Sequence, residues 1–145
     1  MSKNSRAGLY VHVPFCKTKC PYCDFFSLTD LSETARWLRA IDAEAALCDD
    51  GFPVFDTLFV GGGTPSCLTD RELDILFGHL RRRFAFSGAA EITVEVNPDD
   101  VTDTILKTFV SLGVNRISMG IQSFDDNELR FLGRRHNSLQ ARKAI

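Results

Sequence analysis

Short apolar runs alternate with longer amphipathic segments from one end of the chain to the other. Four runs are rich in Val, Ile, Phe and Tyr and are not joined by hairpin turn signals, which is typical of strands in a parallel sheet. They cover residues 9–14, 54–60, 91–96 and 114–121. Each run is followed by a segment whose apolar residues recur at helical spacing. The pattern therefore predicts a β-α unit repeated four times.

The amphipathic segments carry recognisable start and stop signals for helices. Three are expected at residues 33–48, 71–84 and 103–112, a short one ends at residue 132, and a fifth is still running at residue 145. The expected N-caps are Ser32, Thr69 or Asp70, Thr102, Ser123 or Asp125, and Ser138. Glycines at positions 51, 113 and 133 are expected to end helices.

Strands that alternate with helices indicate an α/β fold with a parallel sheet and right-handed crossovers. A closed β/α barrel needs about 200 residues or more, whereas this chain has 145. Four units leave the sheet open, with exposed edges. We therefore expect one domain that is the first part of a larger barrel.

Composition and charge exclude several classes of protein. The formal charge is −2 and 44% of the residues are hydrophobic, which is ordinary for a globular domain and gives no reason to expect nucleic acid as a partner. No apolar run is long enough to span a membrane. The first eight residues are polar and lack a secretory core. We therefore expect a chain that works in the reducing cytoplasm.

Three of the five cysteines follow the first strand, with the spacing C-x3-C-x2-C. They are Cys16, Cys20 and Cys23. Thiolates are soft ligands that select zinc or iron–sulfur clusters, and the absence of a fourth nearby cysteine favours a cluster with one open iron. Zinc remains an alternative, with His12 as a possible fourth ligand. Cys48 and Cys67 lack ligand spacing and are expected to be structural.

Residues suited to ligand binding also follow the other three strands. They are the glycine run at 61–66, the polar group at 95–97 and the pair at 122–123. The carboxyl ends of parallel strands meet at one edge, where α/β proteins form their sites. Glycines let a backbone approach a ligand closely, although the same run could be no more than a tight turn before Pro65. Four clusters at equivalent positions predict a single site.

The motifs together resemble the radical SAM superfamily. The signature is the cysteine spacing with Tyr22 before Cys23, followed by the glycine run. Further stretches resemble the oxygen-independent coproporphyrinogen III oxidase family: YVHVPFC, FVGGGTPS, EVNPDDVT and NRISMGIQSFDDNELRFLGRRH. Tyr22 and the following Asp24 favour the heme-chaperone branch of that family over the oxidase.

The resemblance implies a partial (β/α) barrel of which residues 1–145 are the N-terminal part. It also implies a 4Fe-4S cluster on Cys16, Cys20 and Cys23, and S-adenosylmethionine (SAM) on the open iron. Reductive SAM cleavage is expected of the full-length protein. The residues implied to bind SAM are Tyr10, Tyr22, Gly62, Gly63, Thr64, Glu95, Gln122 and Arg134.

Simpler interpretations of some of these residues stay open at this point. Glu95 also fits a surface carboxylate at a strand end. Arg134 and Arg135 also fit a solvated helix end, and His79 and His136 are expected on the surface.

Three functions are therefore compatible with the sequence. The first is a heme chaperone of radical SAM type, and the second is an anaerobic coproporphyrinogen III dehydrogenase. The third is an inactive fragment or zinc module. The expected partners are SAM, heme or a porphyrinogen, and a low-potential electron donor.

Overall fold

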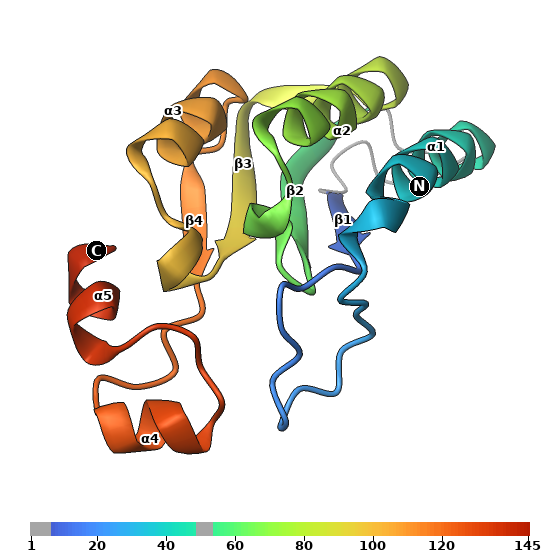
Figure 1. Cartoon of the computed structure of the whole chain (residues 1–145). Coiled ribbons are helices and arrows are strands. Elements are labelled where there is room, and N and C mark those ends of the chain that lie inside the picture. Colours follow the sequence, from blue (N-terminus) through green and yellow to red (C-terminus); the bar gives the residue numbers. More distant parts are fainter. Residues whose placement is uncertain (1–6, 49–53) are drawn as a thin grey trace.

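The computed structural model describes residues 7–48 and 54–145, and its strands form one parallel sheet. The order in the sheet is β1-β2-β3-β4, so each strand pairs with its neighbour in sequence (Figure 1). The strands are β1 (Gly8–Val13), β2 (Phe55–Gly62), β3 (Phe86–Val96) and β4 (Arg116–Met119). The predicted parallel α/β arrangement is confirmed.

The described residues form five α-helices, each of which follows a strand or another helix in the chain. They are α1 (Thr34–Leu47), α2 (Asp70–Arg83), α3 (Asp103–Ser111), α4 (Asp126–Phe131) and α5 (Ser138–Lys143). Three short 3-10 turns precede α1, α2 and α3: η1 (Leu31–Glu33), η2 (Pro65–Cys67) and η3 (Pro98–Asp100). The helix end predicted at Gly51 lies outside the described residues.

The helix starts are partly as predicted. Thr69, Thr102 and Asp125 cap α2, α3 and α4 as expected. The predictions that Ser32 and Ser138 are caps are wrong. Asp30 caps η1 by accepting from the backbone of Ser32, and η1 runs directly into α1. Asn137 caps α5 in a reciprocal pair with Gln140. The short side chain of asparagine can accept from the backbone amide three residues later, as a serine hydroxyl would.

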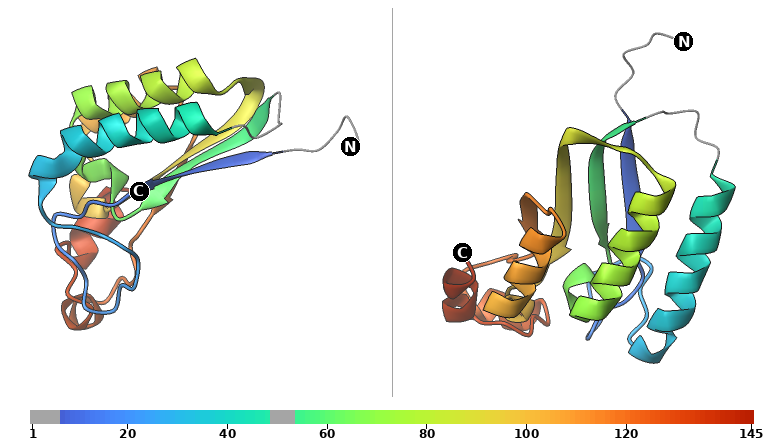
Figure 2. Two further views of the ribbon diagram at one scale, coloured as in Figure 1. Left: turned by 90° about the vertical axis from the view of Figure 1, so that its right-hand side faces the viewer. Right: turned by 90° about the horizontal axis from the view of Figure 1, so that it is seen from above.

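Helices α1, α2 and α3 lie on one face of the sheet (Figure 2). Alternate strand residues point to that face and are buried against the helices: Val11, Val13, Leu58, Val60, Val94 and Val96. Residues of the opposite register face away from these three helices, and Tyr10 is 53% exposed there. The core therefore lies between the sheet and one helical layer, while the other face stays open.

β3 and β4 differ most in length from the sequence prediction. β3 begins at Phe86, five residues early, and pairs with Phe55 across a register shift. β4 is shorter than predicted at both ends. Just before it, the Asn115 side chain accepts from the amide of Ile92 at 2.8 Å and donates to the Ala90 carbonyl at 2.9 Å, while the Asn115 backbone amide donates to the Ile92 carbonyl at 3.1 Å. Among the described residues, no helix is long and apolar enough to cross a membrane.

Candidate functional site

The loop that carries the three cysteines is tied at its root to the end of β2. The amide of Gly63 donates to the Val13 carbonyl at 2.8 Å, and the amide of Thr64 donates to the Phe15 carbonyl at 2.7 Å. The amide of Cys16 donates in turn to the Leu28 carbonyl at 2.9 Å, which closes the loop. The root is therefore an extension of the sheet, and the loop between residues 16 and 28 projects from the carboxyl ends of the strands (Figure 1).

A cavity of about 190 Å³ lies between this loop and the segments that follow the other three strands. Its lining includes most residues that the sequence singled out: Cys16, Cys20, Tyr22, Cys23, Gly62, Gly63, Thr64, Glu95, Gln122 and Arg134. All three cysteines are free thiols. The predicted meeting of the four post-strand clusters is therefore observed.

Arg134 crosses the cavity from the segment after α4 to the cysteine loop. One terminal nitrogen, Nη2, donates to the Asn97 side-chain oxygen and to the Gly120 carbonyl, both at 2.6 Å. The other, Nη1, lies 3.4 Å from the Cys20 sulfur and 3.4 Å from the Tyr22 hydroxyl. The interpretation of Arg134 as a solvated helix end is therefore wrong.

A second set of contacts links Arg134 to the first cysteine through Asn97, which the sequence did not single out by itself. The side-chain nitrogen of Asn97, Nδ2, donates to the Thr64 hydroxyl at 3.3 Å. That hydroxyl donates in turn to the Cys16 sulfur at 3.4 Å. Asn97 directly follows β3, and its place before Pro98 at a strand end was the available signal.

Glu95 faces the glycine run from the neighbouring strand. Its carboxylate accepts from the amide of Gly62 at 3.0 Å. Gly62 has a φ of +109°, which side-chain-bearing residues rarely adopt, so glycine is required for this turn. The interpretation of Glu95 as a bare surface carboxylate is therefore wrong.

Tyr10 is the one predicted residue that does not line the cavity. Its ring stacks on Phe59, with 6.0 Å between centroids, and its hydroxyl lies 3.1 Å from Nδ1 of His12. Burial raises the Tyr10 pKa above its usual value, and the negative charge of Glu95 adds to this. The neutral phenol therefore faces the open side of the sheet, next to the site.

Comparison with known proteins identifies the family. The sequence profile described as "Radical SAM superfamily" matches residues 10–145. The chain belongs to the radical SAM superfamily. This membership implies a 4Fe-4S cluster and SAM as cofactors.

Several relatives are similar over nearly the whole chain. The chain is 37% identical to "Heme chaperone HemW" of Haemophilus influenzae and 39% identical to that of Escherichia coli, over 100% and 99% of its length. It spans about two fifths of those proteins, 40% and 39%. A solved structure, coproporphyrinogen III oxidase (HemN) from Escherichia coli, superposes with a TM-score of 0.82 at 31% identity. That match covers 95% of this chain and 35% of HemN.

The residues of the cavity fit the cofactors of a radical SAM protein. Three free thiols supply the soft donors of a cluster. Among the described residues, no three His, Cys, Asp or Glu side chains are grouped as ligands of one metal ion, and cluster thiolates each bind a different iron. The Ser27 hydroxyl and Nε of Arg134 are buried without a hydrogen-bond partner in the described part of the chain. Both residues line the cavity, so they retain capacity for a ligand.

His12 is engaged away from the cysteines. Its Nε2 donates to the Phe26 carbonyl at 2.9 Å, and its Nδ1 meets the Tyr10 hydroxyl. Both ring nitrogens are therefore already used, and recruiting His12 as a zinc ligand would break one of these bonds.

The prediction that places His136 on the surface is wrong. His79 on α2 is partly exposed, and its Nδ1 lies 2.8 Å from an oxygen of Asp42 on α1. His136 is 3% exposed, and its Nε2 donates to the Ile121 carbonyl at 3.0 Å. Gln122, which follows Ile121 in the chain, has a φ of +69°. His136 therefore holds the strained turn that presents Gln122 to the cavity.

The other two cysteines differ from each other. Cys48 is exposed at the end of α1, which does not fit the expected structural role. Cys67 fits it, because its thiol lies 3.7 Å from the Phe15 carbonyl and burial raises its pKa to about 12.

We expect stability to fall with acidification because of His136. Burial lowers the pKa of His136 below its usual value of 6.5, against the bond to Ile121. The unfolded chain therefore binds the proton more readily, so this contribution is complete above a pH of about 6.5 and is lost as the pH falls below it. His136→Gln, which keeps a donor, should show a smaller drop in urea midpoint between pH 7 and pH 5. Equal drops in the two proteins would contradict the assignment.

Proposed function

We propose that this chain is the cluster- and SAM-binding part of a heme chaperone of radical SAM type. The observation that carries the proposal is the single cavity in which three free thiols, the glycine run and Arg134 meet. The similarity to heme chaperones over nearly the whole chain supports the heme-related part. In this proposal residues 1–145 are the N-terminal part of a longer core domain that works in the cytoplasm.

Each side chain of the cavity has a defined task in this proposal. Cys16, Cys20 and Cys23 hold the cluster. Arg134 offers a planar fork of donors that suits the carboxylate of the methionine part. Glu95, already oriented by Gly62, accepts from the ammonium or from ribose hydroxyls. When bound, the cofactors supply reductive cleavage of SAM to methionine and a 5′-deoxyadenosyl radical.

The remaining residues shape the ligand and its surroundings. The backbone of Gly62 and Gly63 approaches the methionine end, next to the Thr64 hydroxyl. Tyr22 places its ring beside the cluster or the adenine, and Gln122 contacts the ligand from the segment after β4. Tyr10 borders the site from the open face of the sheet. Heme and a low-potential electron donor are the proposed partners of the longer protein.

The choice of the chaperone over the oxidase rests on two residues in the cysteine loop. Tyr22 precedes the third cysteine and Asp24 follows it, which resembles the chaperone branch. The longer protein should therefore transfer heme to an acceptor without converting coproporphyrinogen. Robust decarboxylation of coproporphyrinogen would instead favour the oxidase.

The cofactor part can be tested on the chain itself. Iron and sulfide are added anaerobically, and the reduced protein is examined by electron paramagnetic resonance with and without SAM. A reduced-cluster signal that changes shape with SAM is expected. Zinc binding without a cluster would refute the proposal.

Arg134→Lys should weaken SAM binding while leaving the cluster in place. Lysine keeps the charge but loses the fork that spans Asn97, Gly120 and the cysteine loop. We expect the SAM concentration for half-maximal change of the cluster signal to rise about tenfold, equivalent to one or two lost charge-assisted hydrogen bonds. Arg130→Lys on exposed α4 is the control and should not change it. Unchanged SAM binding in Arg134→Lys would remove Arg134 from the site.

A further inference from the structure

A buried carboxylate lies directly behind the cavity. Asp100 is the last residue of η3, and its side chain is completely inaccessible to solvent. It is not among the residues that line the cavity. Burying a charged group is unfavourable unless it is paired, so the contacts of Asp100 show what it holds.

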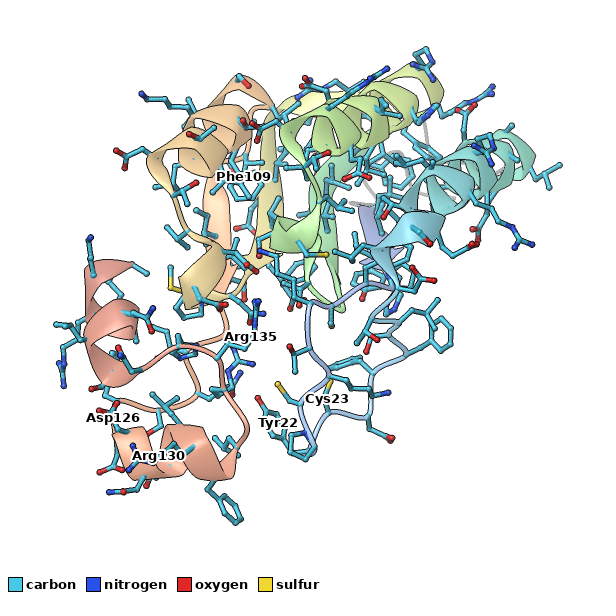
Figure 3. The ribbon with its side chains drawn as sticks, viewed as in Figure 1. Tyr22, Cys23, Phe109, Asp126, Arg130 and Arg135 are labelled. Atoms are coloured by element: carbon cyan, nitrogen blue, oxygen red, sulfur yellow. The ribbon has the colours of Figure 1, made fainter. Side chains whose placement is uncertain are left out.

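Three segments that are distant in sequence donate to this one carboxylate. Lys17 Nζ lies 2.6 Å from Oδ1, and the Ser66 hydroxyl lies 3.0 Å from Oδ2. Arg135 Nη2 lies between the two oxygens, at 3.3 and 3.5 Å. Figure 3 shows Arg135 extending from its segment toward the base of the sheet. Both oxygens are therefore engaged, and two cations neutralise the charge.

The side chains that contact Asp100 all lie within two residues of a cavity residue in the sequence. Lys17 follows Cys16 on the cysteine loop, and Arg135 follows Arg134. Ser66 comes two residues after Thr64, and its hydroxyl also accepts from the amide of Asn97 at 3.2 Å. One side chain therefore fixes the segments that bear cluster ligands relative to the segment that bears Arg134.

We propose that Asp100 is the positioning residue that sets the distance between the cysteine loop and the Arg134 segment. The inference deepens the proposed function, since it rests on the cysteines as cluster ligands and on Arg134 as a SAM contact. Asp100 touches neither cofactor. Asp100 acts on the cluster through Lys17 and on SAM through Arg135. Its loss therefore affects both cluster loading and SAM binding.

The central variant is Asp100→Asn, which keeps the shape of the side chain and removes its charge. Lys17 and Arg135 then face a neutral amide, and breaking a buried ion pair on one side is strongly unfavourable. The matched control is Asp99→Asn. Asp99 is the adjacent carboxylate and pairs with Arg135 at 2.7 Å, but among the described residues its side chain makes no hydrogen bond or ion pair with the cysteine loop.

The first measurement is hydrogen–deuterium exchange of the chain without metal. The amides of Cys16 and Cys23 report on the loop, because they donate to the carbonyls of Leu28 and Cys20. We expect both to exchange about tenfold faster in Asp100→Asn, and to stay unchanged in Asp99→Asn. Unchanged exchange in Asp100→Asn would overturn the proposal, whether or not the chain binds a cluster. Failure of the unaltered chain to load a cluster would count instead against the proposed function.

The second measurement separates positioning from general stability. In the reconstituted protein, Asp100→Asn should lower iron content and raise the SAM concentration needed to change the resonance signal, each by about fivefold or more. Lys17→Met should lower iron content alone, and Lys17→Arg should restore it. Lys17 is 42% exposed, so this variant stays informative even if Asp100→Asn does not fold. Normal loading of Lys17→Met would overturn the proposal.

Discussion

Replacing any one of Cys16, Cys20 and Cys23 by alanine is expected to abolish cluster retention. In the proposed assignment each thiolate holds a separate iron, and no other cysteine has ligand spacing to the loop. Loss of a direct ligand should exceed the effect of losing an outer-shell partner, so iron and sulfide content should fall by more than about tenfold. The measurement is iron and sulfide analysis with the visible absorbance of the reconstituted protein.

Cys67→Ala is the matched control for the three ligand variants. The Cys67 thiol is held neutral by burial, which raises its pKa to about 12, and it lies against the Phe15 carbonyl. A protonated thiol is a poor ligand, so Cys67→Ala should keep full iron content. Loss of iron in this control, or its retention in Cys20→Ala, would show that the ligands are assigned wrongly.

Gly63→Ala is expected to lower the free energy of unfolding by about 2–3 kcal/mol, because the new methyl group meets rigid backbone. A Cβ at this position would lie 2.5 Å from the Phe15 carbonyl oxygen and 2.9 Å from the Phe15 nitrogen. The sheet and the root of the cysteine loop would have to move apart. Urea unfolding followed by circular dichroism measures the loss, and the reconstituted variant should also retain less cluster.

Gly78→Ala tests whether the effect of Gly63→Ala comes from the close approach. Gly78 lies within α2, where a Cβ would meet only the end of the flexible Arg82 side chain, at 3.5 Å. Alanine is a better helix former than glycine by about 1 kcal/mol. The urea midpoint of Gly78→Ala should therefore rise. Similar losses in both variants would contradict the steric argument.

The sequence predicts the fold well because its signals are local. β2 and the second half of β3 are apolar runs with clear ends, and the cap at Thr69 comes with Glu72 three residues later. Signals that depend on distant partners were missed. β3 extends back to Phe86 only because Phe55 pairs with it, and nothing near Phe86 in the sequence indicates this.

The residues of the site also fall into those that the sequence predicts and those that it does not. The cysteine spacing and the glycine run are contiguous motifs, so they are visible in the sequence. His136 and Asp100 are not, because their roles depend on where other segments fold. The Asp100 carboxylate and the Lys17 amine are 83 residues apart in the chain. An aspartate or a lysine among polar neighbours gives no sign that its side chain is buried. A histidine after two arginines favours a surface position.

The attachment of the cysteine loop to the sheet separates folding from metal loading. Its root is held by backbone hydrogen bonds from Gly63 and Thr64 to Val13 and Phe15, and none of these bonds involves a thiolate. In domains whose folding depends on metal, the free energy of binding is itself the folding energy. The bonds at the root need no metal, so we expect a chelator to remove the proposed cluster and leave a folded protein that can be loaded again.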